Sequence, residues 1–554
     1  MLKRIPIGVS DFKEIVSENY YYIDKSLFIN EIIQDGSKVI LLPRPRRFGK
    51  TLNMSMLKYF FEKPEDRVLF EDLKIKSCKE IMDKQGKYPV IYITFKDEKY
   101  SNWQDLRSGL TKLIIDEFGK YEHLLRSDTL ANFEKEEFNN ILNGKADYAT
   151  YLKGLKTLTK YIHKHYNQKI VILIDEYDVP IQSGYLHGYY DEIIDFMRVF
   201  LSSGLKDNEY LEKAVLTGIM RVAKESIFSG LNNLKVSTLL KESYSEHFGF
   251  TEEEVENTLN YYGVEYEIDE VKRWYNGYIF GDTVIYNPWS ILNYVDNFKE
   301  GFKPHWVNTS SNDLVKFVLT KGGEKIQREL EELIQGRELI KIINEDIVMS
   351  DIAKSSENVW SFLLFSGYLK SINKELKNGR LYCTLKIPNL EVQCLYEDII
   401  LDWLKENVNN DRFDFMLQSL VNGEIEAFSD IFEEFVLNSV SYFDVSGNES
   451  EKVYHAFVLG MLVALSEDYE VKSNLESGYG RYDVMIIPRN NDKKGIIIEF
   501  KKVSKRENLQ QAALSALKQI QDKKYRQQLL DRGINDILEL AIAFEGKEVL
   551  VREL

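Results

Sequence analysis

Cysteine is scarce in this chain of 554 residues, which holds three scattered copies and no Cys-x-x-Cys pair. This scarcity excludes a disulfide-built scaffold and a cysteine-ligated zinc site, and it fits a reducing compartment. The N-terminal residues lack the apolar core of a secretion signal, and no apolar run approaches the roughly 18 residues that a membrane span needs. We therefore expect a cytoplasmic protein with no membrane partner.

Basic residues are outnumbered by acidic residues, at 72 against 88, so the formal net charge is -16. This sign argues against a surface that is basic throughout, although a local basic groove for nucleic acid is compatible with it. The chain is long enough for several domains. No internal repeat or low-complexity linker marks their boundaries.

A strand, a loop and a helix are predicted in succession over residues 39–56. An apolar run typical of a buried strand leads into a loop that ends in Gly49, Lys50 and Thr51, and helical periodicity follows. In this layout, backbone N–H groups of the loop and of the helix N-terminus bind phosphate. Lys50 would reach the β- and γ-phosphates, and the Thr51 hydroxyl would hold Mg²⁺.

The loop lacks the first glycine of the usual G-x-x-x-x-G-K-[ST] pattern, because Arg44 stands in its place. Pro45 and two further arginines make this loop stiff and strongly cationic. A basic surface turn between a core strand and a helix is the alternative interpretation. The loop residues predicted to bind the nucleotide are Arg46, Arg47, Phe48, Gly49, Lys50, Thr51 and Leu52.

A second motif, KIVILIDEYD at residues 169–178, supports nucleotide binding. Its apolar run predicts a central parallel strand buried on both faces. Asp175 and Glu176 follow at the strand's C-terminal end, where ligands bind in open α/β sheets. Asp175 would support Mg²⁺ and Glu176 would polarise the attacking water. A solvated acidic turn is the alternative, but the preceding Gly-Lys-Thr turn and a strand candidate at residues 88–95 favour ATP.

Further candidates for the nucleotide site lie on either side of these motifs. Thr217, at the end of an apolar run, would sense the γ-phosphate, and Arg221 would stabilise transition-state charge. A strand end and a surface arginine explain the same two residues equally well. Asp24 and Lys25 are candidates for lining the pocket, although the sequence alone favours a surface ion pair.

Residues 246–311 predict a small lid that packs on the nucleotide domain. Thr251 and Glu254 have the spacing of a helix capping box. The aromatic residues of the following segment are predicted to be core, namely Trp274, Tyr275 and Tyr278. Beyond them, residues 312–440 predict amphipathic helices and a short hairpin near residues 368–387, with no catalytic pattern.

A second site is predicted in the last hundred residues. Two adjacent strands joined by a turn would carry Asp483 on one strand and Glu499 and Lys501 on the other. Because alternate residues of a strand share a face, Glu499 and Lys501 would point the same way while Phe500 packs opposite. Two carboxylates suit Mg²⁺, and the lysine would orient and help deprotonate a metal-bound water. This arrangement suits phosphodiester hydrolysis; a hairpin with an exposed ion pair is the alternative.

Residues around this second site extend the hypothesis. Glu451 lies four residues from His455 on a predicted helix and is a further candidate metal ligand. Gln519 and Tyr525 are candidates for touching a nucleic-acid backbone. Basic residues that would neutralise phosphates gather in the same region: Lys493, Lys494, Lys501, Lys502, Lys505, Arg506, Lys518, Lys523, Lys524 and Arg526.

These motifs resemble bacterial AAA-ATPase-like proteins that pair a P-loop domain with a C-terminal PD-(D/E)XK nuclease-superfamily domain. The resemblance rests on PIGVSDFKEIVSENYYYIDK, RPRRFGKTL, LIDEYDVPI and WYNGYIFG, and nearer the C-terminus on YHAFVLGML, SNLESGYGRYDVMIIP and GIIIEFK. It implies an α/β fold: a P-loop NTPase parallel sheet (1–245), a helical or winged lid (246–311), a helical connecting region (312–440) and an α/β nuclease-like domain (441–554).

The resemblance also implies site roles and a function. Gly49, Lys50 and Thr51 match the phosphate and Mg²⁺ ligands, and the glycine-poor, arginine-rich loop is shared with that family. The implied function is an ATP-driven or ATP-gated, Mg²⁺-dependent nuclease acting on nucleic acid, with DNA favoured over RNA and a homo-oligomer as a further expectation. The alternative is a nucleotide-dependent switch or assembly module whose nuclease-like domain only binds nucleic acid or a partner.

Overall fold

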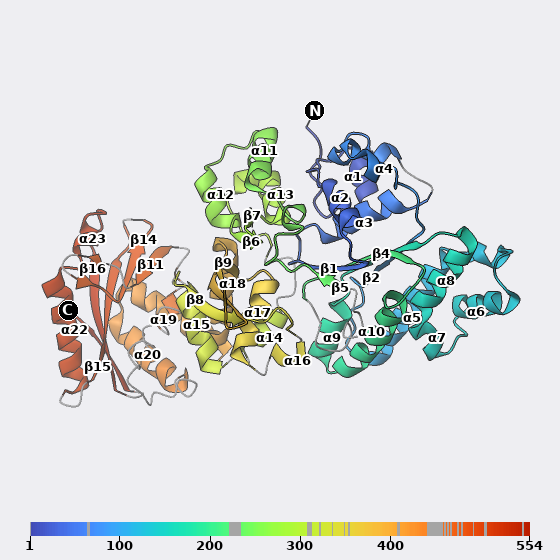
Figure 1. Cartoon of the computed structure of the whole chain (residues 1–554). Helices are drawn as coiled ribbons and strands as arrows, with labels where there is room; N and C mark the ends of the chain where they lie inside the picture. Colours follow the sequence, from blue (N-terminus) through green and yellow to red (C-terminus); the bar gives the residue numbers. More distant parts are fainter. Residues whose placement is uncertain are drawn as a thin grey trace. The chain divides into compact units, whose positions relative to one another are not determined.

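The structure is a computed structural model of the chain (Figure 1). It describes residues 2–554 except 64–66, 221–233, 307–312, 321–322, 335, 348, 353–354, 407–409, 440–457, 459–460, 463–464, 466–467, 474–475, 478–479, 491, 504–506 and 546–547. The chain forms two compact units. The first unit comprises Met1–Val318 with Ile340–Val392, and the second comprises Leu319–Leu339 with Gln393–Leu554.

A five-stranded parallel sheet with strand order β2-β3-β4-β1-β5 is the centre of the first unit. Its strands are β1 (Val39–Pro43), β2 (Val90–Thr94), β3 (Ile170–Asp175), β4 (Leu211–Gly218) and β5 (Leu234–Val236). Every residue of β1 and β3 is buried, which explains their uninterrupted apolar runs. The predicted parallel α/β sheet is confirmed.

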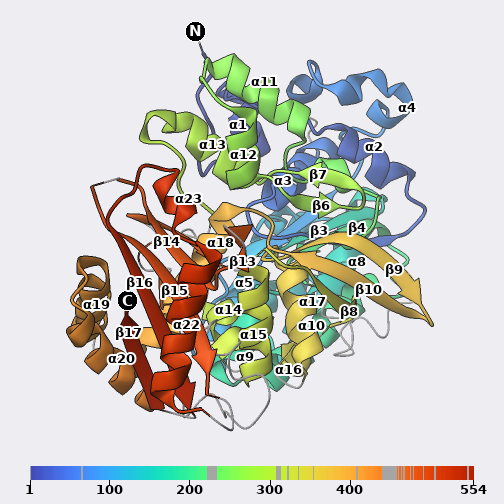
Figure 2. The same ribbon diagram turned by 90° about the vertical axis from the view of Figure 1, so that its left-hand side faces the viewer.

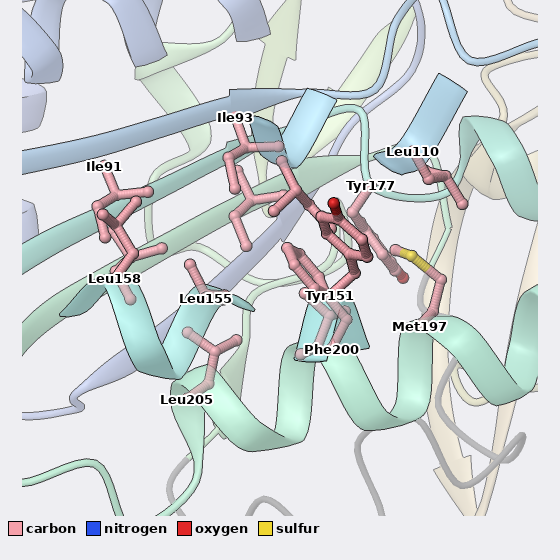
Figure 3. Packing of buried hydrophobic residues seen from close by; sticks show 14 of the residues in the cluster. Ile91, Ile93, Leu110, Tyr151, Leu155, Leu158, Tyr177, Met197, Phe200 and Leu205 are labelled. Atoms are coloured by element: carbon pink, nitrogen blue, oxygen red, sulfur yellow. The ribbon is translucent and has the colours of Figure 1, made fainter. Parts of the chain in front are cut away.

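Helices make the crossovers that parallel strands require. They are α3 (Lys50–Phe61), α4 (Lys79–Met82), α5 (Trp103–Gly119), α6 (Asn132–Leu142), α7 (Tyr148–Leu152), α8 (Gly154–Tyr166), α9 (Val179–His187) and α10 (Tyr190–Leu205), preceded by α1 (Phe12–Ser17) and α2 (Leu27–Gln34). Figure 3 shows Leu155 and Leu158 of α8 and Phe200 of α10 packed beneath Ile91 and Ile93 of β2. This apolar layer holds one face of the sheet and leaves its carboxyl edge for polar residues.

The described part of the predicted lid region, residues 246–306, is a small helical cluster with a two-stranded hairpin. It contains α11 (Glu252–Tyr262), β6 (Tyr278–Phe280), β7 (Thr283–Ile285), α12 (Ile268–Tyr275) and α13 (Pro288–Asp296). The predicted capping box of Thr251 and Glu254 is present at the start of α11. Tyr275 is buried in an apolar cluster against which Trp274 packs, and Tyr278 is also buried, as predicted.

The next segment contains helices and a three-stranded sheet with strand order β8-β10-β9. Its elements are α14 (Asp313–Thr320), α15 (Gly323–Ile334), β8 (Leu339–Ile343), α16 (Met349–Ile352), α17 (Ser356–Phe365), β9 (Lys370–Lys377), β10 (Arg380–Lys386) and α18 (Leu390–Glu406). The predicted hairpin at residues 368–387 is confirmed as β9 and β10, the long pair visible in Figure 2. The third strand, β8, was not expected from the sequence.

The second unit is built on a mixed sheet with strand order β11-β14-β15-β16-β17. Its strands are β11 (Tyr469–Ser473), β14 (Val484–Pro488), β15 (Gly495–Lys502), β16 (Ile537–Glu545) and β17 (Glu548–Glu553), with a small pair β12 (Glu476–Ser477) and β13 (Gly480–Arg481). The helices packed with this sheet are α19 (Asn410–Asn422), α20 (Ile425–Ser439), α22 (Leu509–Lys523) and α23 (Gln527–Leu530); α15, and α18 from Gln393 onward, also belong to this unit. Figures 1 and 2 show α22 and the α19–α20 pair on opposite faces of the sheet, each over its own apolar cluster.

Within the described part of the chain, no helix combines the length and the apolarity that crossing a bilayer requires.

A buried carboxyl group joins three segments of the first unit. Glu391, in the first turn of α18, is fully buried. Its carboxylate accepts hydrogen bonds from the Ser290 hydroxyl of α13 at 2.7 Å and from the backbone N–H of Trp306. Burial raises the pKa of Glu391 to about 7 because the charged form loses its hydration.

We expect Glu391→Gln to flatten the pH dependence of unfolding. The pKa of Glu391 is raised in the folded protein, so the unfolded chain loses this proton first as the pH rises above about 4.5. The free energy of unfolding therefore falls as the pH rises, until the pH exceeds the pKa of Glu391 in the folded protein, about 7. Glutamine keeps a carbonyl acceptor and has no such proton to lose. The fall in unfolding free energy between pH 5 and pH 8 should shrink by roughly 1–3 kcal/mol in urea titrations.

The matched control is Glu426→Gln, because Glu426 also lies in a first helical turn but is exposed. This control should reproduce the pH profile of the wild type. Identical profiles for the wild type and Glu391→Gln would contradict the effect assigned to burial.

Candidate functional site

The phosphate loop connects β1 to α3 at the carboxyl edge of the parallel sheet. Gly49 has a left-handed backbone with φ of 80° and begins α3, so a residue without Cβ fits this turn best. Lys50 is buried, and its ammonium donates a hydrogen bond to the Pro45 carbonyl at 2.9 Å. Burial lowers the pKa of Lys50, while Glu176 and Asp175 act in the opposite direction. The loop thus folds over a buried cation.

Asp175, the last residue of β3, connects the phosphate loop to the neighbouring strand β4. The Thr51 hydroxyl donates to Asp175 Oδ2 at 2.7 Å, and the Thr217 hydroxyl donates to Oδ1 at 2.5 Å. Burial raises the pKa of Asp175, and the two hydroxyl donors partly offset that rise. Thr51 is therefore oriented by Asp175, as expected of a hydroxyl that would hold Mg²⁺.

Glu176 lies beside this network at the mouth of a cavity. Its backbone is left-handed with φ of 52°, an unusual conformation for a residue with a side chain. Its N–H lies 3.4 Å from the Thr217 hydroxyl oxygen. The structure thus brings Lys50, Thr51, Asp175, Glu176 and Thr217 together at one edge of the sheet.

A cavity of about 540 Å³ opens next to the phosphate loop, a volume within the usual range of ligand sites. Its walls come from the loop, from N-terminal residues 6–10 and from the lid region. Arg47 lines it with a left-handed backbone and stacks on the Trp289 ring of α13 at 4.1 Å. All seven predicted loop residues line this cavity: Arg46, Arg47, Phe48, Gly49, Lys50, Thr51 and Leu52.

Arg44, which occupies the position of the first glycine, does not add to the charge of the cavity. It is fully buried, and its guanidinium donates to the carbonyls of Pro43 at 2.8 Å and Ser237 at 2.7 Å. It also lies over the rings of Phe248 and Phe280. Burial lowers the pKa of Arg44 to about 9, so the group stays protonated at neutral pH. Arg44 therefore keeps its charge but anchors the loop from behind, and Arg46 and Arg47 are the loop arginines that line the cavity.

Lys25 corrects the expectation of a surface ion pair. Its side chain is only 10% exposed and lines the cavity, and its ammonium lies 2.6 Å from the Glu254 carboxylate of α11. Asp24 instead accepts backbone N–H groups of Ser26 and Lys74. Sequence reasoning missed this ion pair because its partners are 229 residues apart. The remaining candidate of this region, Arg221, lies outside the described residues.

The second unit brings the predicted nuclease residues together at one end of the paired strands β14 and β15. The Asp483 carboxylate accepts the Phe500 N–H at 2.8 Å, and the Asp483 N–H lies 3.4 Å from the Glu499 carboxylate. Phe500 packs in the cluster on the α19–α20 face, whereas Ile497 packs on the α22 face. Because residues 497, 499 and 501 alternate with Phe500, Glu499 and Lys501 lie on the α22 side.

Glu499 is 2% exposed and is held by α22, because the side-chain amide of Gln519 donates to its carboxylate. The structure places Gln519 against Glu499, and its expected contact with a nucleic-acid backbone stays a prediction. Tyr525 is 1% exposed, so its predicted backbone contact is wrong: the ring is part of the core. A phosphate backbone cannot reach a side chain that apolar neighbours cover.

The predicted basic cluster is spread over several segments: Lys501 and Lys502 end β15, and Lys518 and Lys523 lie on α22. Lys493 lies 2.7 Å from Asp468, and Lys494 lies 2.8 Å from Asp536, both before the strand begins. These contacts neutralise them, so they do not form one surface with Lys501. Lys505 and Arg506 lie outside the described residues, as do Glu451 and His455.

The donor set of the second site fits a divalent cation. Asp483 and Glu499 supply the hard oxygen ligands that Mg²⁺ prefers. Among the described residues, no group of three or more His, Cys, Asp and Glu side chains gathers for metal binding. A Mg²⁺ ion at either site would therefore complete its shell with phosphate oxygens and water, which is its usual mode.

Comparisons with known proteins agree with this geometry. Residues 6–228 match the family model of a predicted AAA-ATPase, and residues 449–554 match that of the PD-(D/E)XK nuclease superfamily. A protein of Azotobacter chroococcum mcd 1, named as an uncharacterized protein in the vnfD 5′ region, is 26% identical over 546 residues, covering 96% of this chain and 94% of the relative. The resemblance inferred from the motifs is confirmed for both domains.

We expect Arg44→Ala to destabilise the protein by roughly 2–4 kcal/mol, because the carbonyls of Pro43 and Ser237 would lose their buried donor. The matched control is Arg47→Ala in the same loop, because Arg47 is exposed. That substitution should change the unfolding free energy by less than about 0.5 kcal/mol. Urea denaturation at neutral pH measures both. Equal destabilisation by the two substitutions would show that Arg44 is not the anchor.

Proposed function

For a chain that joins an AAA-ATPase-like domain to a PD-(D/E)XK nuclease-superfamily domain, we propose an ATP-dependent nuclease. The first unit binds ATP with Mg²⁺, and the second cleaves phosphodiester bonds of nucleic acid in a Mg²⁺-dependent reaction. The observation that carries the proposal is the bonded set Thr51–Asp175–Thr217 beside buried Lys50, at the edge of a cavity of ligand size.

Charge and geometry support triphosphate binding at the loop. Lys50 is buried beside a carbonyl, and a phosphate oxygen is a stronger acceptor for its ammonium. Binding an anion there would also favour the charged form that burial disfavours. Thr51, fixed by Asp175, would hold Mg²⁺, which neutralises charge on the β- and γ-phosphates. Glu176 lies where it would orient the attacking water.

The second unit has the residues for metal-assisted hydrolysis. Asp483 and Glu499 would hold Mg²⁺, which supplies charge stabilisation for the phosphodiester group. Lys501 lies two residues along the same strand face and would orient the attacking water and accept its proton. The leaving oxygen would take a proton from solvent, so the products are a phosphomonoester and a hydroxyl.

One observation favours the alternative of a switch or assembly module without cleavage. Glu499 is buried, and its carboxylate already accepts a hydrogen bond from Gln519. In this alternative, the nuclease-like domain would bind nucleic acid or a partner protein without cleaving it, and ATP binding would control that interaction. The two functions differ in a single readout, cleavage, while ATP binding is common to both.

Lys50→Ala tests the nucleotide half of the proposal. Removing the buried ammonium should weaken ATP binding by about 10- to 100-fold, the loss expected for a charge-assisted hydrogen bond. Lys58→Ala is the control, because Lys58 lies on the same helix but faces Glu62 at 3.8 Å. Calorimetric titration with ATP and Mg²⁺ measures both variants. Unchanged affinity in Lys50→Ala would contradict the assignment of the phosphate site.

Glu499→Gln tests the nuclease half. The substitution keeps the volume of a buried side chain and removes its charge, so cleavage should fall by at least about 100-fold. Glu539→Gln is the control, since Glu539 is a buried carboxyl group on the next strand of the same sheet. Cleavage of single- and double-stranded DNA and RNA is measured with Mg²⁺ or Mn²⁺, with and without ATP.

Cleavage by the wild type and the two variants distinguishes the nuclease from the switch or assembly module. Cleavage that Glu499→Gln loses and Glu539→Gln keeps supports the nuclease. Cleavage by Glu499→Gln at the wild-type rate would contradict the assignment of Glu499 to the nuclease site. ATP binding without cleavage of any of the four substrates would favour the switch.

A further inference from the structure

The two arginines beside the cavity are held in different ways. Arg47 stacks on Trp289 of the lid region. Arg46 donates a hydrogen bond from Nη2 to Oε1 of Gln182, on α9, at 3.2 Å. Gln182 is buried, and its own amide donates from Nε2 to Asp178 Oδ2 at 3.0 Å. The Arg46 guanidinium is thus oriented by a buried side chain, whereas that of Arg47 rests on an aromatic face.

Asp178 connects this arginine to the end of β4. Its Oδ2 also accepts the backbone N–H groups of Ile219 at 2.9 Å and Met220 at 3.1 Å. Asp178 is 1% exposed, and burial raises its pKa. Asp178 and Gln182 are four residues apart at the start of α9, so both side chains lie on one face. A Cβ placed on Gly218 would lie 2.6 Å from Asp178 Oδ1, so the fit at this position requires glycine.

This chain of contacts places Arg46 on the side of the cavity where a γ-phosphate would lie. Lys50 and Thr51 mark the position of the β-phosphate at the start of α3. The next phosphate extends toward the ends of β3 and β4, where Asp175 and Thr217 meet. Thr217 lies two residues before Ile219, whose backbone N–H Asp178 accepts. Arg46 also lies close enough to Lys50 for the two charges to influence each other.

We propose that the Asp178–Gln182 pair holds Arg46 against the γ-phosphate, so that Arg46 distinguishes a nucleoside triphosphate from a diphosphate within one chain. This inference rests on the proposed binding of ATP and names the residues that read its terminal phosphate. Arg46 is the contacting residue, and Gln182 and Asp178 are positioning residues. No second copy of the chain is needed to supply this charge.

The chemistry of the anchor explains why an amide holds the guanidinium. A carboxylate at position 182 would pair with Arg46 and neutralise the charge that a phosphate should meet. The glutamine amide fixes one of five N–H donors and leaves the positive charge intact. The Asp178 carboxylate contacts Gln182 and not Arg46 in this chain of hydrogen bonds. It also accepts the backbone N–H groups of Ile219 and Met220.

The test compares the affinities of the full chain for ADP and for a non-hydrolysable β,γ-imido ATP, both with Mg²⁺, by calorimetry. Arg46→Ala should weaken triphosphate binding by about 10- to 100-fold and ADP binding by less than about threefold. Gln182→Ala should weaken triphosphate binding by about 3- to 10-fold, again with little effect on ADP. Lys58→Ala is the control for losing one positive charge outside the cavity lining and should leave the ratio of the two affinities unchanged.

A double variant separates positioning from general structural damage. If Gln182 acts through Arg46, Arg46→Ala combined with Gln182→Ala should bind the triphosphate no more weakly than Arg46→Ala alone. An additive loss, or equal losses for the two nucleotides in Arg46→Ala, would overturn the inference. Wild type that binds ADP without preferring the triphosphate would overturn it too. Wild type that binds neither nucleotide would overturn the proposed function itself.

Discussion

The buried carboxylate of Asp175 is the interaction on which the first unit depends. Strand order β2-β3-β4-β1-β5 places β4 between β3 and the strand that leads into the phosphate loop. Asp175 therefore has to reach across the end of β4, and it does so by accepting hydroxyls from Thr217 on that strand and from Thr51 beyond it. A buried carboxylate without such donors would be strongly disfavoured, so the bonds hold three chain segments in one arrangement. The position of the phosphate loop relative to Glu176 follows from this arrangement.

Arg44 shows how a loop with little glycine keeps a fixed shape. Glycine normally lets such a loop bend close to a phosphate. Here the guanidinium fills the space behind the loop, between backbone carbonyls and the rings of Phe248 and Phe280. Gly367 allows a second close approach, because a Cβ there would lie 2.8 Å from Pro45. The loop is thus held by its surroundings, and this leaves two of its three arginines beside the cavity.

The features that the sequence predicted are those that local periodicity determines. Buried parallel strands such as β1 and β3 have continuous apolar runs, and ligand-binding residues such as the acidic pair after β3 follow the carboxyl end of a strand. Glu499 and Lys501 share a face because side chains alternate along a strand. Contacts between distant segments were missed, because no local pattern encodes them: Lys25 meets Glu254, and Arg46 meets Gln182. Tyr525 was misassigned for a related reason: it follows α22 in a segment rich in basic residues, and only the packing of distant residues shows that its ring is buried.

Both sites hold charged side chains by hydrogen bonds to uncharged groups. Lys50 and Arg46 are oriented by neutral oxygen acceptors, the Pro45 carbonyl and the Gln182 amide, which leave their positive charge available to an anion. Asp483 accepts the Phe500 N–H and Glu499 accepts the side-chain amide of Gln519, so both carboxylates are held in part by uncharged donors. Held like charges raise the energy of the folded chain, and a counter-charged ligand relieves it. Lys50 and Glu499 are buried, and stability alone would favour apolar residues at buried positions, so the proposed ligand binding accounts better for these two charges.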